Sequence, residues 1–362
     1  MQMVKNITDI KYFLEKFEIV DNRYNYQVDY HTSVNISFSS LPTFVAEFKN
    51  CSVNSCPVLV TENRHLITTH VWNLTHQIRN KPQKSHKLWT TWGDTVDIIM
   101  PPITKQFNDA YKYVWLPIDE ESAVNPWHIL IDVISKFRLI EKRWSKNVNN
   151  YIFILANPSP YFNKLAKELF PELKYYVVPK GETWKFQHLI VPSASNHNDG
   201  VLTPPLAPWL RHFKGKYQKS TTHNRKIYIE RQGSLTRNVN NHHELLLALK
   251  GWESVRLETM SVADQIKTFS EASHILAPHG AGLVNLLWCK EGTKVIEIQD
   301  GNMVGKKVYP ILSHMLQLKH ELYIAPTVPI KIEGKEKPNG VKRLNDLISF
   351  NINIPDLIKH LD

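Results

Sequence analysis

Short apolar runs alternate with amphipathic stretches over the second half of the chain. Apolar runs of strand length fall at residues 226–230, 254–257, 274–277, 294–298 and 322–324. Helical periodicity falls between them, at residues 241–250, 261–273, 283–289 and 306–318, and Ser261 is placed to cap the second of these helices. Strands that alternate with helices are typical of a parallel sheet covered on both faces. This half is therefore predicted to be a doubly wound α/β lobe.

The first half carries a similar alternation. Strands are predicted at residues 34–38, 57–61, 151–156, 175–178 and 189–192, and helices at 126–141 and 161–170. The stretch 192–208 is rich in Ser, Asn and Pro, which favours a linker. We predict an N-terminal lobe over residues 1–200, a C-terminal lobe over 201–335, and a segment at 336–362 whose helix, at 344–361, packs back toward the N-terminal lobe.

Two α/β lobes joined by one polar linker leave a cleft between them. Ligands of doubly wound sheets bind at the carboxyl ends of the strands. We therefore expect the functional site in the interlobe cleft.

The composition is that of an ordinary globular protein. Hydrophobic residues make up 42% and charged residues 22% of the 362 residues, which excludes a disordered protein, a collagen and a coiled-coil rod. No apolar run approaches the roughly 20 residues of a membrane-spanning helix, and the first residues include Asp9, Lys11 and Glu15, unlike a signal peptide. We expect a soluble chain that is cytoplasmic rather than lumenal.

The cysteines suggest neither a disulfide framework nor a metal site. The chain has three cysteines, Cys51, Cys56 and Cys289, which are too few to stabilise a protein of this size by disulfide bonds. Cys51 and Cys56 are close enough in sequence to pair. No Cys-x-x-Cys motif or paired Cys/His cluster occurs, which argues against a structural zinc ion.

The formal net charge of +10 calls for an anionic partner, which can be nucleic acid, a membrane surface or a small ligand. Eight basic residues and one acid, Glu230, lie between Gly200 and His243. We interpret Lys214, Lys216 and Lys219 as part of a solvated linker. Arg231 and Arg237 differ from these lysines because they follow a predicted strand.

The most informative motif is Pro-His-Gly-Ala-Gly-Leu-Val-Asn at residues 278–285. A strand ends at Pro278, the chain turns through Gly280, Ala281 and Gly282, and a helix begins. Free backbone N–H groups and the helix dipole make such a turn an anion site, and small residues let a diphosphate approach the main chain. His279 is placed to donate to a phosphate oxygen. The alternative is a tight turn in which the glycines are needed only for the backbone conformation and bind no ligand.

A second feature of the same lobe favours the anion site. Arg231 and Arg237 follow the first strand of the lobe, so we expect them at the same carboxyl edge as His279. Guanidinium groups suit bidentate contacts with phosphate. Glu297 closes the next strand and is placed to accept hydrogen bonds from a ribose, or else is a carboxylate exposed at a strand end.

In the first lobe, the segment Asn-Pro-Trp-His at 125–128 opens a predicted helix. His128 and Asp132 are four residues apart, so they share a helix face and the carboxylate can orient the imidazole. Together they are candidates for a general base, since a catalytic histidine works near neutral pH. The alternative is a hydrogen bond on the helix surface.

These motifs together resemble the signatures of glycosyltransferase family 61. The resemblance rests on residues 278–285 with 294–298, on 228–237 followed by Asn240, Glu244 and Leu245, and on 125–128 with Asp132, and it covers about residues 115–323. The family includes plant β-1,2-xylosyltransferases and the animal extracellular O-GlcNAc and O-mannose-linked GlcNAc transferases.

The resemblance implies a GT-B fold of two Rossmann-like lobes and an inverting reaction. The expected donor is a UDP-sugar, UDP-xylose or UDP-GlcNAc, held mainly by the C-terminal lobe, and the expected acceptor is a hydroxyl of a glycan or glycoprotein. The resemblance places Arg231, Arg237, His279, Gly280, Ala281, Gly282 and Asn285 near the donor diphosphate and Glu297 near the ribose. His128 and Asp132 would then face the acceptor.

No obligatory cofactor or metal is expected. Metal-dependent sugar transferases often use an Asp-x-Asp pair, which is absent from this chain. The two arginines and the helix N-terminus are therefore expected to stabilise the departing diphosphate.

Other classes of activity stay open from the sequence. A CoA-dependent acyltransferase would use His128 and Asp132 as a His-x-x-x-Asp motif, but the partner Asp-Phe-Gly-Trp-Gly motif is absent, and a serine hydrolase would need an absent Gly-x-Ser-x-Gly elbow. A pI near 9.2 and ten tryptophans suggest nucleic-acid binding, although the basic residues gather around one predicted phosphate site, so no nucleic-acid partner is expected. A sugar-binding protein without turnover is the last alternative.

Overall fold

The computed structural model divides the chain into two compact units. The first comprises Met1–Asn25 and Phe38–Leu206, and the second comprises Tyr26–Ser37 and Ala207–Asp362. The predicted boundary, between residues 200 and 201, lies close to the division between Leu206 and Ala207. The structure describes residues 3–4, 16–21, 25–29, 35–39, 43–55, 58–62, 66–67, 89–92, 95–98, 100–108, 112–118, 125–143, 151–156, 158–193, 196–197, 201–234, 236–300, 307–329 and 348–361.

The main sheet of the second unit is entirely parallel. Its strands are β17 (Arg225–Ile229), β18 (Glu253–Val255), β19 (Ala272–Pro278), β20 (Lys294–Gln299) and β21 (Lys319–Ile324). They lie in the order β18-β17-β19-β20-β21. All the strands predicted for this part of the chain are confirmed, and the α/β class of this unit with them. The strand order reverses between β17 and β19, which makes this the switch point of the sheet.

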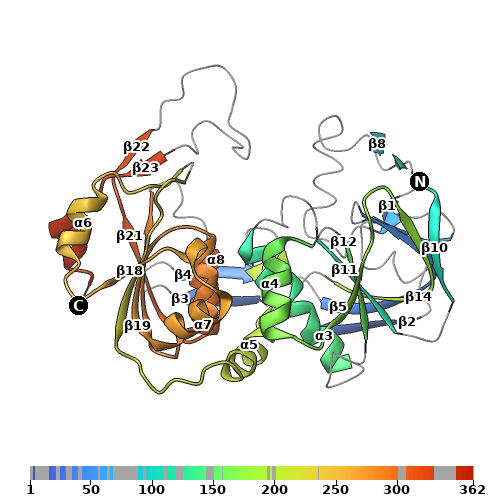
Figure 1. The fold of residues 1–362 in the computed structure, drawn as a ribbon, viewed down its shortest axis with the longest axis horizontal. Coiled ribbons are helices and arrows are strands. Elements are labelled where there is room, and N and C mark those ends of the chain that lie inside the picture. The colour runs from blue at the N-terminus through green and yellow to red at the C-terminus, as the bar shows by residue number, and fades with distance from the viewer. Residues whose placement is uncertain are drawn as a thin grey trace. The chain divides into compact units, whose positions relative to one another are not determined.

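Helices cover both faces of this sheet (Figure 1). On one face lie α6 (His242–Ala248) and α9 (Ile354–Ile358), and on the other lie α7 (Val262–Glu271), the 3₁₀ helix η5 (Ala281–Trp288) and α8 (Val308–Met315). A short 3₁₀ turn, η4 (Leu257–Thr259), precedes α7. Ser261 caps α7 as expected, because its hydroxyl oxygen accepts a hydrogen bond from the backbone N–H of Asp264.

The predicted helix at 344–361 is wrong. Residues Ile348–Phe350 form strand β23, which pairs with β22 (Thr327–Pro329), and the only helix described here is the short α9. Phe350, Ile352 and Leu357 belong to the apolar core of the second unit, instead of the expected packing toward the N-terminal lobe. The physical reason is the period: Ile348, Phe350 and Ile352 alternate with polar residues, which is the pattern of a strand.

The main sheet of the first unit is mixed rather than doubly wound throughout. Strands β14 (Thr183–Pro192), β11 (Tyr113–Pro117), β12 (Ile152–Ala156) and β13 (Lys174–Val177) are parallel to one another, but β5 (Thr43–Asn54) runs antiparallel to β14. The remaining strands of this sheet are β1 (Met3–Val4), β2 (Lys16–Asp21), β6 (Leu59–Val60), β7 (Leu66–Ile67) and β10 (Ile103–Phe107). The expected fully parallel lobe is therefore wrong for the β5 side, where short connections to β6 and β7 impose antiparallel pairing.

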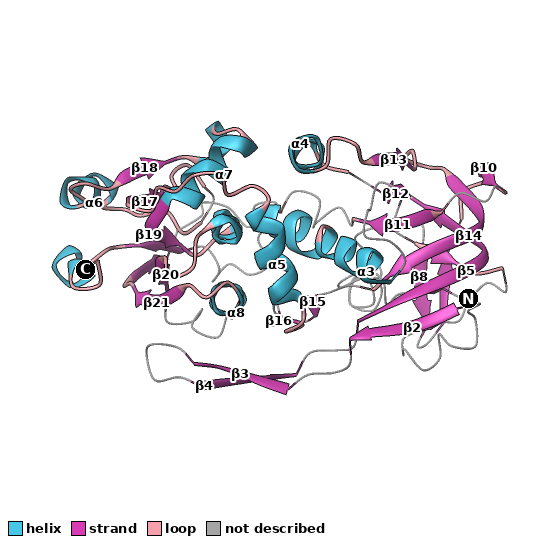
Figure 2. Ribbon diagram, turned by 90° about the horizontal axis from the view of Figure 1, so that it is seen from below, coloured by secondary structure: helices cyan, strands magenta, loops and turns pink. Residues whose placement is uncertain are grey.

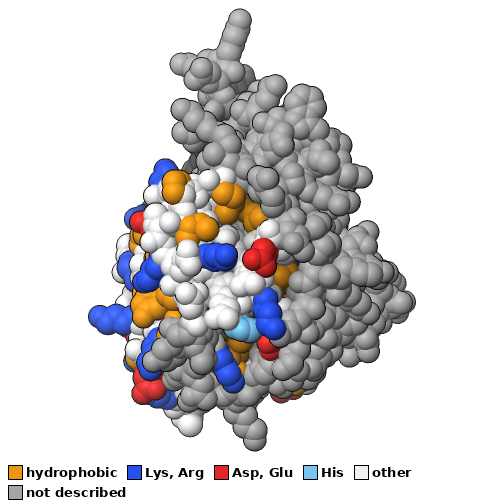
Figure 3. All heavy atoms as spheres, turned by 90° about the vertical axis from the view of Figure 1, so that its right-hand side faces the viewer, with side chains coloured by type: hydrophobic (Ala, Val, Ile, Leu, Met, Phe, Trp, Pro, Cys, Tyr) orange, Lys and Arg blue, Asp and Glu red, His pale blue; other side chains and the backbone are white. Residues whose placement is uncertain are grey.

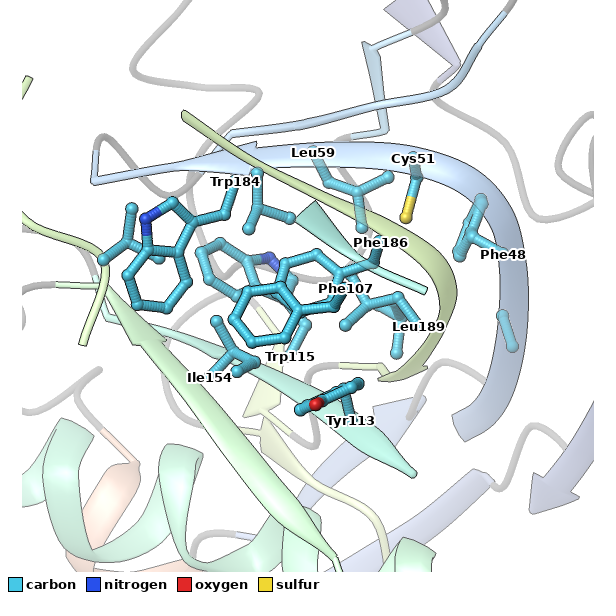
Figure 4. Packing of buried hydrophobic residues seen from close by; sticks show 14 of the residues in the cluster. Phe48, Cys51, Leu59, Phe107, Tyr113, Trp115, Ile154, Trp184, Phe186 and Leu189 are labelled. Carbon is cyan, nitrogen blue, oxygen red and sulfur yellow. The ribbon is translucent and has the colours of Figure 1, made fainter. Parts of the chain in front are cut away.

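The core of the first unit lies on one face of this curved sheet (Figure 4). Side chains from β5, β10, β11, β12 and β14 point toward one another, and the rings of Phe107 and Phe186 stack with centroids 4.6 Å apart. Burial of each such aromatic side chain stabilises the fold by about 1.5–3 kcal/mol. Cys51 lies in this core as a free thiol, and Cys56, its possible partner, lies outside the described residues.

Crossover helices connect the parallel strands of the first unit. The π-helix η2 (His128–Val133) and α3 (Ser135–Arg143) lie between β11 and β12, and α4 (Pro160–Leu169) lies between β12 and β13. Helix α3 packs against β2, β5 and β14 (Figure 2). Both predicted helices of this half are confirmed, although the first begins as a π-helix.

Three strand pairs and one helix complete the described elements. The pairs are β3 (Asn25–Asp29) with β4 (Asn35–Ser39), β8 (Trp89–Trp92) with β9 (Thr95–Ile98), and β15 (Asn196–His197) with β16 (Val201–Leu202). The helix is α5 (Leu206–Gly215). No helix in the described part of the chain has the length and apolar character needed to cross a bilayer.

The interpretation of Lys214 as a solvated linker residue is wrong. Lys214 is buried at the end of α5, where its ammonium group donates to the carbonyl oxygen of Cys289 at 2.6 Å. Burial lowers the pKa of this lysine. Its role is to tie α5 to the segment after η5.

Candidate functional site

The switch point of the second sheet is where a ligand is expected to bind. In a doubly wound sheet the loops that leave the two strands at the switch point diverge, and a crevice opens at their carboxyl ends. Arg231 lies in the loop that leaves β17, and His279 lies in the loop that leaves β19. The strand order therefore places these two residues in the loops that leave the two neighbouring strands of the switch point.

The loop after β17 is held in a fixed shape by its own side chains. Asn238 accepts from the backbone N–H of Ser234 and donates to its carbonyl oxygen, at 3.1 and 2.7 Å. The hydroxyl of Thr236 donates to the carbonyl oxygen of Ile348, and the backbone N–H of Arg237 donates to the same oxygen. Arg237 has a φ of 63°, which costs a non-glycine residue roughly 1–3 kcal/mol. The pairing with β23 keeps Arg237 in this conformation.

The structure brings both predicted arginines to the turn after β19. One guanidinium nitrogen (Nη1) of Arg237 donates to the carbonyl oxygen of His279 at 2.6 Å. Arg231 donates from Nε to the carbonyl oxygen of Thr236 at 3.1 Å. Its Nη1 lies against Gly280 so closely that a Cβ atom on Gly280 would be 2.4 Å away. Arg231, Arg237, His279 and Gly280 therefore form one cluster.

The cluster is strongly basic. Burial and, to a smaller extent, the charge of Arg237 lower the pKa of Arg231 to about 10. Arg231 is still charged at neutral pH, and within the described residues it forms no ion pair. A partly buried guanidinium without a carboxylate partner is unfavourable by itself. Its presence at the switch point indicates a place for an anionic ligand.

The turn adds backbone donors to the two guanidinium groups. The N–H groups of Gly280, Ala281 and Gly282 donate to no carbonyl oxygen of the described chain, whereas Leu283 already donates to Gly280. Successive free N–H groups at the start of a helix form an anion-binding concavity. Gly282 has a separate packing reason, because a Cβ there would lie 2.8 Å from Leu257 and 3.5 Å from Ile229.

Two further predicted residues have buried side chains with internal partners. Asn285 donates to the side-chain oxygen of Gln265 at 3.0 Å and to the carbonyl oxygen of Gly282 at 3.2 Å, which fixes η5 to α7. Glu297 has no exposed surface and bonds to His279 and His320. It is therefore not exposed at the strand end, and its contact with a ribose stays a prediction, as does the contact of Asn285 with the donor.

The first unit holds the other predicted pair. His128 is the first residue of η2, and its Nδ1 lies 2.5 Å from the Oδ2 atom of Asp132. The side-chain oxygen of Asn125 accepts from the backbone N–H of Trp127 and shapes the start of this helix. The bond from Ile134 N–H to the carbonyl oxygen of Ile129 has the wider spacing of a π-helix, which occurs frequently at functional sites.

The position of this pair in its unit parallels that of the turn in the other unit. Because η2 begins the crossover from β11 to β12, His128 lies on the side of the carboxyl end of β11. Asp132 is buried and His128 is partly exposed. The carboxylate can accept a hydrogen bond from the Nδ1 proton of the imidazole, which selects the tautomer in which Nε2 is the unprotonated nitrogen.

Sequence reasoning missed two residues of the second unit's cluster. Tyr309 from α8 packs its ring edge-on against the ring of His279, with centroids 5.2 Å apart. His320 from β21 reaches Glu297 from the opposite side. Neither lies in a motif, and only the three-dimensional packing of α8 and β21 brings Tyr309 to His279 and His320 to Glu297.

No metal cluster accompanies these residues in the part of the chain that is described. There, no three His, Cys, Asp or Glu side chains are grouped so that they could hold an ion. On the face shown in Figure 3, the described Lys and Arg side chains lie apart, with acidic, apolar and uncharged groups between them.

Comparison with known proteins identifies the family. Residues 127–296 match the model of the family Glycosyltransferase 61. This part of the chain belongs to glycosyltransferase family 61. The matched region begins beside His128 and ends beside Glu297, so it contains Arg231, Arg237 and the turn after β19. The class of activity is therefore transfer of a sugar. No curated protein matches the chain.

Proposed function

We propose that the protein is an inverting glycosyltransferase that moves a sugar from a UDP-sugar to a hydroxyl of a glycan or glycoprotein. The observation that carries the proposal is the partly buried guanidinium of Arg231, which has no ion pair in the described chain and lies against Gly280 at the switch point of a parallel sheet. A diphosphate supplies the negative charge that this arrangement lacks.

The donor diphosphate would bind to the two guanidinium groups and the backbone of the turn. Arg231 and Arg237 supply charge, and Gly280, Ala281 and Gly282 supply N–H donors. The same groups stabilise the negative charge that grows on the diphosphate as the sugar–oxygen bond breaks. Because this stabilisation comes from fixed protein groups, we propose that the reaction needs no metal ion.

His128 is the proposed general base. Asp132 holds its Nδ1 proton, so Nε2 accepts the proton of the acceptor hydroxyl while the oxygen attacks the anomeric carbon. A single displacement of this kind inverts the configuration at that carbon. The proposal includes the GT-B fold that the family resemblance implies. The family's donors UDP-xylose and UDP-GlcNAc are the first candidates.

A thermal-shift panel of UDP-, GDP- and CMP-sugars tests the donor. UDP and its sugars should raise the melting temperature, because a ligand that binds only the folded state stabilises it. Arg231→Ala and Arg237→Ala should abolish this shift and leave the melting curve without ligand near that of the wild type. An undiminished increase in melting temperature with UDP in both variants would show that the two arginines do not bind the donor.

Two assays separate this proposal from its alternatives. Hydrolysis of the UDP-sugar without acceptor would distinguish a transferase from a sugar-binding protein that has lost turnover. Activity that disappears with a chelator and returns with manganese would overturn the proposed metal independence. Stabilisation by CoA rather than by UDP would favour an acyltransferase that uses His128 and Asp132.

A further inference from the structure

A chain of buried polar side chains runs behind the turn after β19. Ser313 from α8 bonds through its hydroxyl to Nδ1 of His320 at 2.7 Å, and Nε2 of His320 bonds to Oε2 of Glu297 at 2.9 Å. The other oxygen of Glu297, Oε1, is in close contact with Nδ1 of His279 and accepts from Nε2 of Gln299 at 2.9 Å. All five side chains are buried.

The hydrogen-bond pattern fixes the state of Glu297. Burial raises the pKa of this carboxyl, but the charges and hydrogen bonds of His279 and His320 outweigh burial and hold the pKa well below its usual value. Glu297 is therefore an ionised acceptor, and both imidazole nitrogens that face it carry hydrogen. The tautomer of His279 follows: Nδ1 is protonated, and Nε2 is left for the crevice, with no partner among the described residues.

The network is not needed for stability alone, because well-packed apolar side chains in the same space often make a fold as stable as a buried ionic network does. The network ends, however, at His279, whose carbonyl oxygen accepts from Arg237 and which immediately precedes the turn 280–282. Its position thus connects the core of the sheet to the proposed diphosphate site.

Charges of both signs surround His279. The carboxylate of Glu297 on β20 contacts its ring, and the guanidinium groups of Arg231 and Arg237, from the loop after β17, lie at the backbone of His279 and Gly280. Tyr309 on α8 packs against the ring. A bound diphosphate would neutralise the positive charge of the arginines and place negative charge near the ring, and both changes stabilise a cation there.

We propose that diphosphate binding is coupled to uptake of a proton by His279, and that Glu297 and His320 are the positioning residues that make this possible. The inference rests on the proposed function. The proton comes from solvent, and the resulting Nε2–H donates to a phosphate oxygen. Glu297 acts on the diphosphate through His279 and does not touch it.

Calorimetric titration of the whole protein with UDP-xylose or UDP-GlcNAc, in buffers of different ionisation enthalpy, measures this proton directly, because the diphosphate of a nucleotide sugar has no group that titrates near neutral pH, unlike the terminal phosphate of UDP. Near neutral pH the wild type should take up as much as about one proton per ligand bound, and its affinity for the ligand should fall as the pH rises from about 6 to about 8, where histidine titrates. Glu297→Gln should remove the proton uptake and flatten this pH dependence. His314→Gln, on the exposed side of α8, is the matched control and should behave like the wild type.

A spectroscopic measurement covers the case in which Glu297→Gln does not fold. The imidazole ¹⁵N shifts of the wild-type protein, assigned with His279→Gln, should show His279 protonated at Nδ1 alone without ligand and at both nitrogens with UDP. Binding of the nucleotide sugar without proton uptake and with unchanged shifts of His279 would overturn this inference and leave the proposed function intact. Absence of any UDP binding would overturn both.

Discussion

Replacement of Gly280 by alanine probes the role of Arg231 without changing Arg231 itself. The added Cβ would lie 2.4 Å from Nη1 of Arg231, whereas ordinary contact begins at about 3.4 Å, so the guanidinium must move by about 1 Å. The backbone of Gly280 is extended, with a φ of 176°, which alanine can adopt. The atom that must move is the end of a flexible side chain, so we expect the free energy of unfolding to change by less than about 1 kcal/mol.

The displaced guanidinium should cost ligand affinity instead. A charge-assisted hydrogen bond contributes about 1.5–3 kcal/mol, so Gly280→Ala should weaken UDP binding by a factor of about 10 to 150. Calorimetric titration gives the affinity, and urea unfolding gives the stability. Gly215→Ala is the control, because a Cβ there meets no atom within 4 Å.

Gly282→Ala should instead lower the stability of the fold. Its Cβ would lie 2.8 Å from Leu257, so overpacking should destabilise the fold by about 1–3 kcal/mol.

The reasoning about Arg231 is refuted if Gly280→Ala folds normally and binds UDP as tightly as the wild type.

Three further outcomes follow from the structure. Asp132→Asn should slow sugar transfer at saturating donor by about 10²- to 10⁴-fold and leave the affinity for UDP unchanged, because it impairs only the base His128; undiminished turnover would exclude the pair as the base. Ser261→Ala should lower the free energy of unfolding by about 0.5–2 kcal/mol in urea, since it removes the hydroxyl that caps α7 at Asp264; an unchanged midpoint contradicts this. The lowered pKa of Glu297 contributes stability that is present above the ordinary value of 4.5 and is lost as the pH falls toward the folded-state value. At pH values below 4.5, the urea midpoint of the wild type should therefore decrease more steeply with falling pH than that of Glu297→Gln. Parallel curves for the two proteins would contradict the lowered pKa.

The second unit was largely predictable because each of its elements has a clear local signal. Its strands are short apolar runs bounded by polar turns, and Ser261 marks the start of α7 by itself. The error at Ile348–Phe350 came from reading a helical period into a segment whose alternation is that of a strand. The antiparallel pairing of β5 with β14 joins segments more than a hundred residues apart, so no local sequence pattern predicts it.

The candidate site was predictable in part, for a topological reason. Residues that follow parallel strands lie at one edge of a sheet whatever the strand order, so Arg231 and His279 could be placed together from sequence alone. The direction of a side chain needs the packed structure. Glu297 points into the core toward His320, and Lys214 is buried against Cys289, because of contacts made by distant elements.

Amide hydrogen exchange of the wild-type protein with saturating UDP tests the central claim most directly, since the claim names individual backbone donors. The account predicts slower exchange at Gly280, Ala281 and Gly282 and in the loop that holds Arg231 and Arg237. Unchanged exchange of these amides, with UDP bound and protection found elsewhere in the chain, would contradict it.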